Sequence, residues 1–264
     1  MNRILWAALV VLLLSRGPAS AQGRMFFGAD LDGGTQAEGI GVDMQDTHGY
    51  KSKNVKATDP NKLCDIIGKQ FGADPVTHKL PCNGGLLFVY IAAHGGAGDP
   101  AGDDGYMVSV VNGQKKWIKD NDLAKCIAEM IPPCCVLVFT MDCCGTNAWW
   151  DNYLNNPARN PFRGINFIAA VADVPGLTCP ESPVRKKISA GISQGAMTAE
   201  QYCEYLKKRD ALTPRNLLVK SVCNFTDDAH KNRLVQVPEP TSMAVLAGGA
   251  GLLIWRRRNR ASSK

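Results

Sequence analysis

The sequence predicts an α/β fold built around a mainly parallel β-sheet. Three short runs of continuous apolar residues support this prediction, at residues 86–93, 135–141 and 165–171. Runs of this kind are typical of parallel strands that are buried on both faces. Because segments with helical patterns separate the runs, we expect the strands to alternate with helices and to pair in parallel.

The remaining elements are predicted from cap and turn residues. The Gly- and Asp-rich region before residue 59 is expected to form short strands at 25–29 and 39–44. Asp59 followed by Pro60 is typical of a helix start, and Gly72 is typical of its end. Further elements are expected along the chain: a hairpin strand at 106–111, helices at 122–130 and 198–209, and a last strand at 217–222.

Residues 1–21 have the layout of a secretory signal peptide. Arg3 precedes a short apolar stretch, and the stretch is followed by Ala19-Ser20-Ala21, which is typical of a cleavage site. The apolar stretch is short for a membrane-spanning helix. We therefore expect cleavage and export rather than an uncleaved amino-terminal anchor.

The other end of the chain has three parts in order: Pro-Glu-Pro at 238–240, an apolar run at 243–255 and an arginine cluster at 256–260. This arrangement resembles the PEP-CTERM sorting signal of envelope-bearing bacteria. The resemblance implies an exosortase-type processing enzyme as a partner. An apolar run followed by arginines also implies anchoring in the membrane. We expect the protein at the cell envelope or cell surface, and an ordinary single-pass anchor predicts the same compartment.

The chain between the two ends is long enough for one substantial domain. We divide it into an N-terminal segment with the first strands at 22–58, a main domain at 59–225 and a linker at 226–237, followed by the sorting tail at 238–264. Seven of the 30 basic residues but one of the 24 acidic residues lie in the two targeting ends. The domain itself is therefore close to neutral, and nothing in its charge indicates nucleic acid as a partner.

Two of the predicted parallel strands end in residues that carry chemistry. His94 follows the strand at 86–93, and Cys144 follows the strand at 135–141. In parallel sheets the ligand crevice lies at the carboxyl ends of the strands, so the two side chains are expected to face each other there. A thiolate nucleophile needs a nearby imidazole, and the oxyanion needs backbone amides, for which Gly95 and Cys144 are the candidates.

These residues resemble the metacaspase branch of the caspase-like cysteine peptidases. The resemblance rests on a strand ending in His94-Gly95, on Asp104-Gly105-Tyr106, and on a strand ending in Asp142-Cys143-Cys144-Gly145. The separation of about 50 residues between His and Cys agrees with the caspase pattern. Covering about residues 59–220, the resemblance implies a three-layer α/β/α sandwich and an endopeptidase whose nucleophile is Cys144 rather than Cys143.

The resemblance also implies further site residues. Asp142 would line the primary specificity pocket, with Asp59 as a second contributor, and would select Arg or Lys in the peptide or protein substrate. A buried carboxylate that faces a guanidinium or ammonium group gives that choice a physical basis. Asp120, Asp122 and Asp151 lie where calcium-responsive relatives carry acidic ligands; no cofactor is required, and calcium is the candidate ion.

Each assignment has an alternative. His94 could be a core histidine, Cys143 and Cys144 could join disulfides in an exported chain of ten cysteines, and Asp142 could cap a turn. The family's usual His-Ser-Gly after the nucleophile is replaced by Gly-Thr-Asn at 145–147. The alternative function is a catalytically inactive scaffold or binding protein of the cell envelope. An esterase is disfavoured because no Gly-x-Ser-x-Gly elbow is present.

Overall fold

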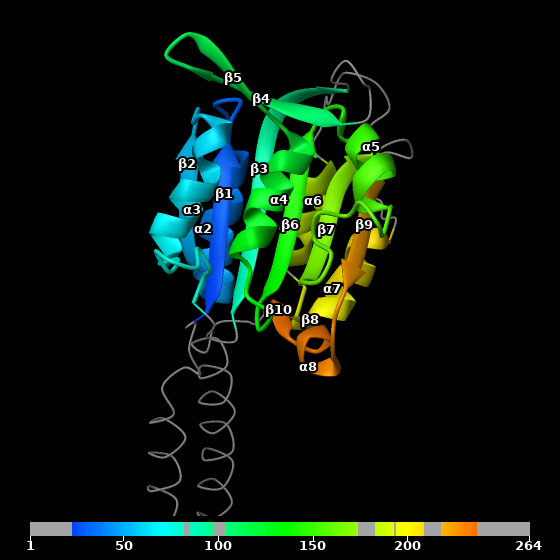
Figure 1. The fold of residues 1–264 in the computed structure, drawn as a ribbon. Helices are drawn as coiled ribbons and strands as arrows, with labels where there is room; N and C mark the ends of the chain where they lie inside the picture. The colour runs from blue at the N-terminus through cyan, green and yellow to red at the C-terminus, as the bar shows by residue number, and fades with distance from the viewer. Residues whose placement is uncertain are drawn as a thin grey trace, which may run out of the picture.

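The computed structural model of the protein describes residues 23–81, 85–97, 104–173, 183–192, 194–208 and 218–236. Their central sheet has the strand order β2-β1-β3-β6-β7-β9, in which the first five strands run parallel and β9 runs antiparallel to β7 (Figure 1). The prediction of an α/β fold with a mainly parallel sheet is confirmed. The strands are β1 (Arg24–Asp30), β2 (Lys51–Lys56), β3 (Leu86–Ala97), β6 (Val136–Cys143), β7 (Asn166–Asp173) and β9 (Leu218–Asn224).

Helices cover both faces of the sheet and give three layers (Figure 1). Side chains along each buried strand alternate between the two faces, as the period of a strand requires. In β3, for example, Val89 and Ile91 pack in one core while Phe88 and Tyr90 pack in the other. The first core is covered by α3 (Leu63–Phe71), α4 (Asp120–Met130), α5 (Thr146–Trp149) and the π-helix η2 (Trp150–Leu154), and the second by α2 (Gln36–His48), α6 (Pro183–Ile192) and α7 (Ala199–Lys207).

The carboxyl end of β3 leaves the parallel ladder and pairs with a hairpin. This hairpin consists of β4 (Gly105–Val111) and β5 (Gln114–Lys119), and it projects from the top of the molecule in Figure 1. Asn112 and Gly113 join the strands with φ angles of 51° and 76°. Positive φ at both central residues is what the favoured two-residue hairpin turn requires, so the turn matches its sequence.

The region before residue 59 differs in part from the prediction. The strand expected at 25–29 is present as β1, but the strand expected at 39–44 is wrong because those residues lie in α2. Ile40 and Met44 are four residues apart and both are buried, which is the spacing of one helix face. The helix expected from Asp59 is present as the 3₁₀ helix η1 (Pro60–Lys62) followed by α3.

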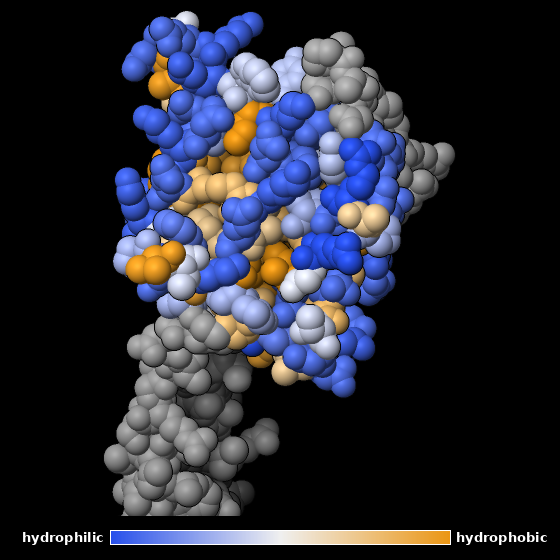
Figure 2. Space-filling model, in the orientation of Figure 1, coloured by the Kyte–Doolittle hydropathy of each residue, from blue (hydrophilic) through white to orange (hydrophobic). Residues whose placement is uncertain are grey.

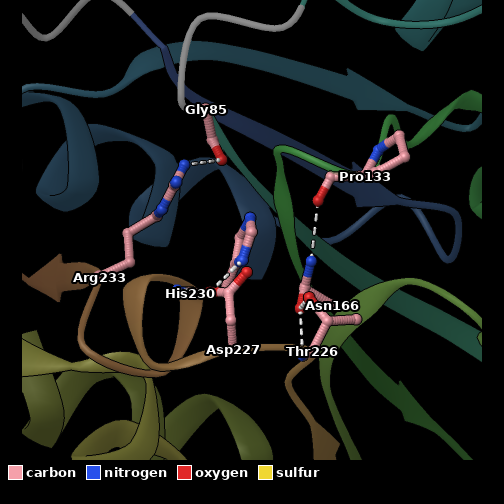
Figure 3. Close-up of polar contacts among 7 residues, drawn as sticks. All are labelled: Gly85, Pro133, Asn166, Thr226, Asp227, His230 and Arg233. Carbon is pink, nitrogen blue, oxygen red and sulfur yellow. Dashed lines mark hydrogen bonds and ion pairs between the residues drawn. The ribbon is translucent and has the colours of Figure 1, made fainter.

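Polar contacts at the amino ends of the strands hold the last described segment to the sheet (Figure 3). Asn166 Nδ2 donates to the carbonyl of Pro133 at 2.9 Å, and Asn166 Oδ1 accepts from the amide of Thr226 at 2.7 Å. Arg233 Nη1 donates to the carbonyl of Gly85, directly before β3, at 2.9 Å. We call this set of contacts the amino edge.

The segment expected to be a linker, 226–237, is folded against the amino edge over much of its length. It contains α8 (Asp228–Lys231) and β10 (Leu234–Gln236), and β10 pairs with β8 (Met197–Thr198). Val235 is fully buried, and its carbonyl accepts from Tyr50 Oη at 2.7 Å. Residues 234–236 therefore belong to the domain rather than to a linker.

Two disulfides reinforce the layers. Cys64–Cys126 joins α3 to α4, and Cys203–Cys223 joins α7 to β9. Cys134 is disulfide-bonded as well. Disulfides of this kind persist in oxidising compartments, which agrees with an exported protein.

Candidate active site

His94 and Cys144 lie side by side at the carboxyl edge of the sheet. The parallel ladder between β3 and β6 ends with the pair Ala93–Cys143, and each candidate catalytic residue is the next one along its strand. Neighbouring strands are about 4.8 Å apart, so the two backbones are adjacent at this point. The His94 side chain is exposed and Cys144 is 9% exposed. The fold thus brings the predicted nucleophile and base to one open edge.

Gly95 permits this close approach of the two strand ends. A Cβ atom at Gly95 would overlap Cys143 Sγ and would come within 2.7 Å of the Cys144 carbonyl oxygen. Gly145 then turns the chain with a φ of 80°, a conformation that favours glycine. Thr146 Oγ1 fixes the turn by donating to the carbonyl of Ala172 on β7 at 3.0 Å. The candidate nucleophile is thus held on a tight strand-to-helix turn.

The two adjacent cysteines have different surroundings. Cys143 is 1% exposed, packs in the core under α3 and α4, and lies 3.5 Å from the Cys144 carbonyl oxygen. Cys144 is the next residue and is not part of that core. Neither thiol is disulfide-bonded, and among the described residues only Cys135 shares that state. The disulfide alternative for Cys143 and Cys144 does not occur in this structure.

Asp142 is a buried carboxylate two residues before Cys144. Its Oδ2 accepts from Tyr90 Oη at 2.8 Å. The pKa of Asp142 is raised to about 6, mainly by burial and to a smaller extent by the charge of Asp32. The Tyr90 hydroxyl and the backbone amide and charge of Arg185 act in the opposite direction. The backbone amide of Arg185 belongs to the first turn of α6, so Asp142 contacts the amino end of that helix rather than the turn at 143–146 that the alternative named.

Asp32 is a site residue that the sequence analysis did not identify. It follows β1, the neighbour of β3 in the sheet, and its charge acts on Asp142. The charges of Asp32 and Arg185 thus act on Asp142 in opposite directions at this edge. The signal that could have identified Asp32 is its position just after a strand of the same sheet, where ligand-binding residues gather.

Among the described residues, no contact joins Asp59 to Asp142. Its Oδ1 accepts from the Asn61 backbone amide at 3.1 Å and from Asn61 Nδ2 at 3.0 Å, and these hydrogen bonds lower the pKa of Asp59. Asn61 Nδ2 also donates to the carbonyl of Trp117 in β5 at 3.1 Å. The structure thus gives Asp59 a role in anchoring the hairpin to η1.

A buried acidic pair lies beneath the turn that follows Cys144. Asp104 and Asp120 are 2% and 0% exposed. Burial raises the pKa of Asp104 to about 6, and burial together with the charge of Asp104 raises the pKa of Asp120 well above its usual range. A Cβ atom at Gly105 would overlap Asp120 Oδ2 and would come within 3.1 Å of the Gly145 carbonyl oxygen. Both Asp120 oxygens and Asp104 Oδ1 lack hydrogen-bond partners in the described part of the chain.

The three residues predicted to bind calcium are not gathered into one site. Asp120 is buried, whereas Asp122 is exposed in the first turn of α4 and Asp151 is exposed in η2. Within the described ranges, no group of three or more His, Cys, Asp or Glu side chains is arranged to hold a metal ion. Of these three residues, only Asp120 has buried carboxylate oxygens without a hydrogen-bond partner, and its acidic neighbour is Asp104.

Comparison with known proteins identifies the tail. The family model of the PEP-CTERM protein-sorting motif matches residues 236–258, which confirms the prediction for this end of the chain. The motif marks a protein that is exported, recognised by an exosortase-type processing enzyme and anchored in the cell envelope by its tail. No curated protein matches the chain. No helix among the described residues has the length and apolar character needed to cross a membrane.

Proposed function

We propose that this protein is an exported, caspase-like cysteine endopeptidase that uses Cys144 and His94 to cleave peptide bonds after Arg or Lys. The observation that carries the proposal is the register of β3 and β6. Because Ala93 and Cys143 form the last pair of the ladder, the imidazole and the thiol belong to adjacent positions on an open edge. The Cys144 thiol is not disulfide-bonded. Of the other described cysteines, Cys135 and Cys143 share that state and the rest form disulfides.

The chemistry of such a dyad follows from the roles of its groups. His94 accepts the thiol proton, and the Cys144 thiolate attacks the carbonyl carbon of the scissile bond. The negative charge on the carbonyl oxygen would be stabilised by backbone amides, for which Gly95 and Cys144 are the candidates. His94 then gives its proton to the leaving amine, and a water molecule hydrolyses the resulting thioester to release the acid and restore the thiol.

The preference for a basic residue rests on Asp142 and Asp32. Asp142 is a buried carboxylate at this edge and the charge of Asp32 acts on it, so the two acidic groups would attract a cationic substrate residue. A guanidinium can form two parallel hydrogen bonds with a carboxylate, which makes Arg the better substrate residue. Burial of Asp142 strengthens the interaction because little water competes for it.

The architecture and the compartment agree with this proposal. A mainly parallel sheet between two helical layers, with a hairpin directly after the histidine strand, is compatible with a caspase-like sandwich. The PEP-CTERM motif supplies the export route, and a secreted endopeptidase would act on peptide or protein substrates outside the cytoplasm. Calcium is a further part of the proposal with a changed ligand set: Asp120 is kept, Asp122 and Asp151 are dropped, and Asp104 is added, since this ion prefers carboxylate oxygen atoms.

The test is turnover of fluorogenic peptides that end in Arg, Lys or Asp by the purified full-length protein, with and without calcium. We expect cleavage after Arg and Lys, loss of cleavage in Cys144→Ala, and retention in Cys143→Ala. Loss in Cys143→Ala alone would identify the other thiol as the nucleophile. No turnover of any peptide would favour the inactive scaffold instead.

A further inference from the structure

We propose that the outer face of the β4–β5 hairpin binds the part of the substrate that leaves after cleavage, and that it selects a large apolar or aromatic side chain beside acidic residues. The inference rests on the proposed function and specifies the substrate for that same site. The surface consists of Val108, Val110 and Trp117, with Lys115 and Lys119 at its margins.

The register of the hairpin places this surface next to His94. His94 pairs with Val108 across β3 and β4, and Val108 pairs with Trp117 across β4 and β5. Directly opposite residues in antiparallel strands project from the same face. His94, Val108 and Trp117 therefore form a row on one face. Two strand spacings, about 10 Å in total, separate the backbone of His94 from that of Trp117.

The two faces of the hairpin differ in burial. Met107 and Ser109 on the inner face are 0% and 1% exposed, since that face packs toward the core under α3 and α4. On the outer face, Trp117 is 59% exposed and Val110 is 53% exposed. A large aromatic side chain offers most binding energy where it is accessible and held in place.

Trp117 sits on a fixed backbone. Asn61 Nδ2 donates to the Trp117 carbonyl at 3.1 Å, and Asp59 Oδ1 accepts both from that same Asn61 amide group and from its backbone N–H. The pair Asp59 and Asn61 thus ties the hairpin to η1. A surface that is ordered before binding loses less entropy when the substrate arrives.

The charge of the hairpin identifies the neighbours of the apolar residue in the substrate. Residues 105–119 contain three lysines and no acidic residue. Lys115 pairs with Val110 and Lys119 pairs with Tyr106, so both flank Trp117 on the outer face. The charge of Lys119 also acts on Asp104, so the exposed Lys115 is the main cation for the substrate. Figure 2 shows the hairpin as a mostly hydrophilic projection with apolar side chains among the polar ones. Complementary charge favours Asp or Glu in the bound peptide.

The position of His94 sets the direction of the peptide. The imidazole protonates the leaving amine, so the leaving segment extends from Cys144 past His94 toward the hairpin. An extended peptide advances about 3.3 Å per residue, and about 10 Å therefore corresponds to three residues. Trp117 is expected to contact the third residue after the scissile bond.

The experiment compares two peptides that share an Arg at the cleavage site. One carries Glu-Trp-Glu and the other Lys-Ala-Lys at the second to fourth positions after it. We expect the full chain to cleave the first with a kcat/KM about tenfold higher. In Trp117→Ala this ratio should fall toward one, and in Asn61→Ala it should fall in part because the hairpin loses its anchor. Val42→Ala, at a 50% exposed position on α2, serves as the matched control and should keep the ratio.

Binding to the Cys144→Ala protein, followed by fluorescence anisotropy, separates this inference from the proposed function. Tighter binding of the Trp peptide, lost on addition of Trp117→Ala, supports the surface even if no peptide is cleaved. Equal binding and equal cleavage of the two peptides would overturn the inference while leaving the peptidase intact. A preference for the Trp peptide that persists in Trp117→Ala would overturn it as well.

Discussion

At the amino edge of the sheet, the side chains of Asn166 and Arg233 have hydrogen-bond partners within the protein, whereas buried carboxylate oxygens near the carboxyl edge lack partners among the described residues. Asn166 uses both ends of its side chain, and Arg233 donates to a backbone carbonyl (Figure 3). At the carboxyl edge, Asp120 has two buried oxygens without a partner among the described residues, and burial raises the pKa of Asp142 to about 6.

This difference separates the part of the molecule that stabilises the fold from the part suited to chemistry. A satisfied buried polar group contributes modestly to stability, whereas an ionised group in a buried position costs free energy. Residues with strongly shifted pKa values gather at functional sites, because the burial that makes ionisation costly also adapts a group for proton transfer or for binding an opposite charge. Substitutions at the two edges should therefore have opposite consequences.

The largest expected effect is on catalysis at the carboxyl edge. His94→Asn should lower kcat by about 10³-fold or more, since the base and the proton donor are lost together. Its melting temperature should stay within about 1 °C of wild type because the side chain is exposed. His78→Asn, an exposed histidine in the loop after α3, is the matched control and should retain full kcat. A loss of activity in both variants would contradict the assignment of His94.

The amino edge should respond in the opposite way. Asn166→Ala removes three hydrogen bonds of a buried side chain, to the Pro133 carbonyl and to the amide and hydroxyl of Thr226, each worth about 0.5–1.5 kcal/mol. We expect the free energy of unfolding in urea to fall by about 2–3 kcal/mol while kcat per folded molecule is unchanged. The exposed Asn232→Ala should change stability by less than about 0.5 kcal/mol.

Asp142→Asn should raise stability and remove selectivity. In the folded protein the pKa of Asp142 lies at about 6, above the usual 3.8, so the folded state holds this proton more tightly than the unfolded state does. Stability from this group is present below pH 4 and is lost as the pH rises through 6. At about 1.4 kcal/mol per pH unit, the variant should be more stable than wild type by up to about 3 kcal/mol at pH 8 and by none at pH 3.5.

The same substitution also tests the pocket. We expect Asp142→Asn to reduce the preference for Arg over neutral residues at the cleavage site. In the wild-type protein the Arg preference should weaken as the pH falls below 6, because the protonated carboxyl no longer carries a charge. Cleavage after Arg that is unchanged in the variant at pH 8 would exclude Asp142 from the specificity pocket.

The smallest effect concerns calcium. At ten times its Kd, calcium should stabilise the wild-type protein by about 1.4 kcal/mol in thermal unfolding. The increment should be larger at pH 8 than at pH 5, since Asp104 must be ionised to bind the ion. Asp120→Asn should abolish the response and the exposed Asp122→Asn should retain it. An equal response in both variants would place calcium elsewhere.

The central strands could be predicted because they are buried on both faces. β3, β6 and β7 are continuous apolar runs in the sequence, and β3 and β6 are neighbours, so His94 and Cys144 follow adjacent strand ends as expected. By contrast, α2 contains Gly39 and Gly41 and has few apolar residues, so its helical period was hidden. Ile40 and Met44 have helical spacing, but Val42 between them also gives the alternation of a strand, and only the packing of Ile40 and Met44 against the sheet separates the two.

The details of the site depended on contacts between distant segments. Asp142 could be singled out from its spacing to Cys144, but the residues whose charges act on it come from distant segments, Asp32 after β1 and Arg185 in α6. Asp59 is a good helix cap in sequence, and that is the role its hydrogen bonds to Asn61 show. The assignment of Asp59 to the pocket came from the family resemblance and finds no contact with Asp142 among the described residues.

The position of β10 places the start of the sorting tail at the opposite end of the sheet from the candidate site. Gln236 lies at the amino edge, where the sorting motif begins, whereas His94 is eight residues along β3 from Leu86, about 26 Å away. The six residues between Gln236 and Met243 span at most about 22 Å. Because the sorting tail follows Gln236, the candidate site lies at the opposite end of the sheet from the point where the tail begins, beyond the reach of these six residues.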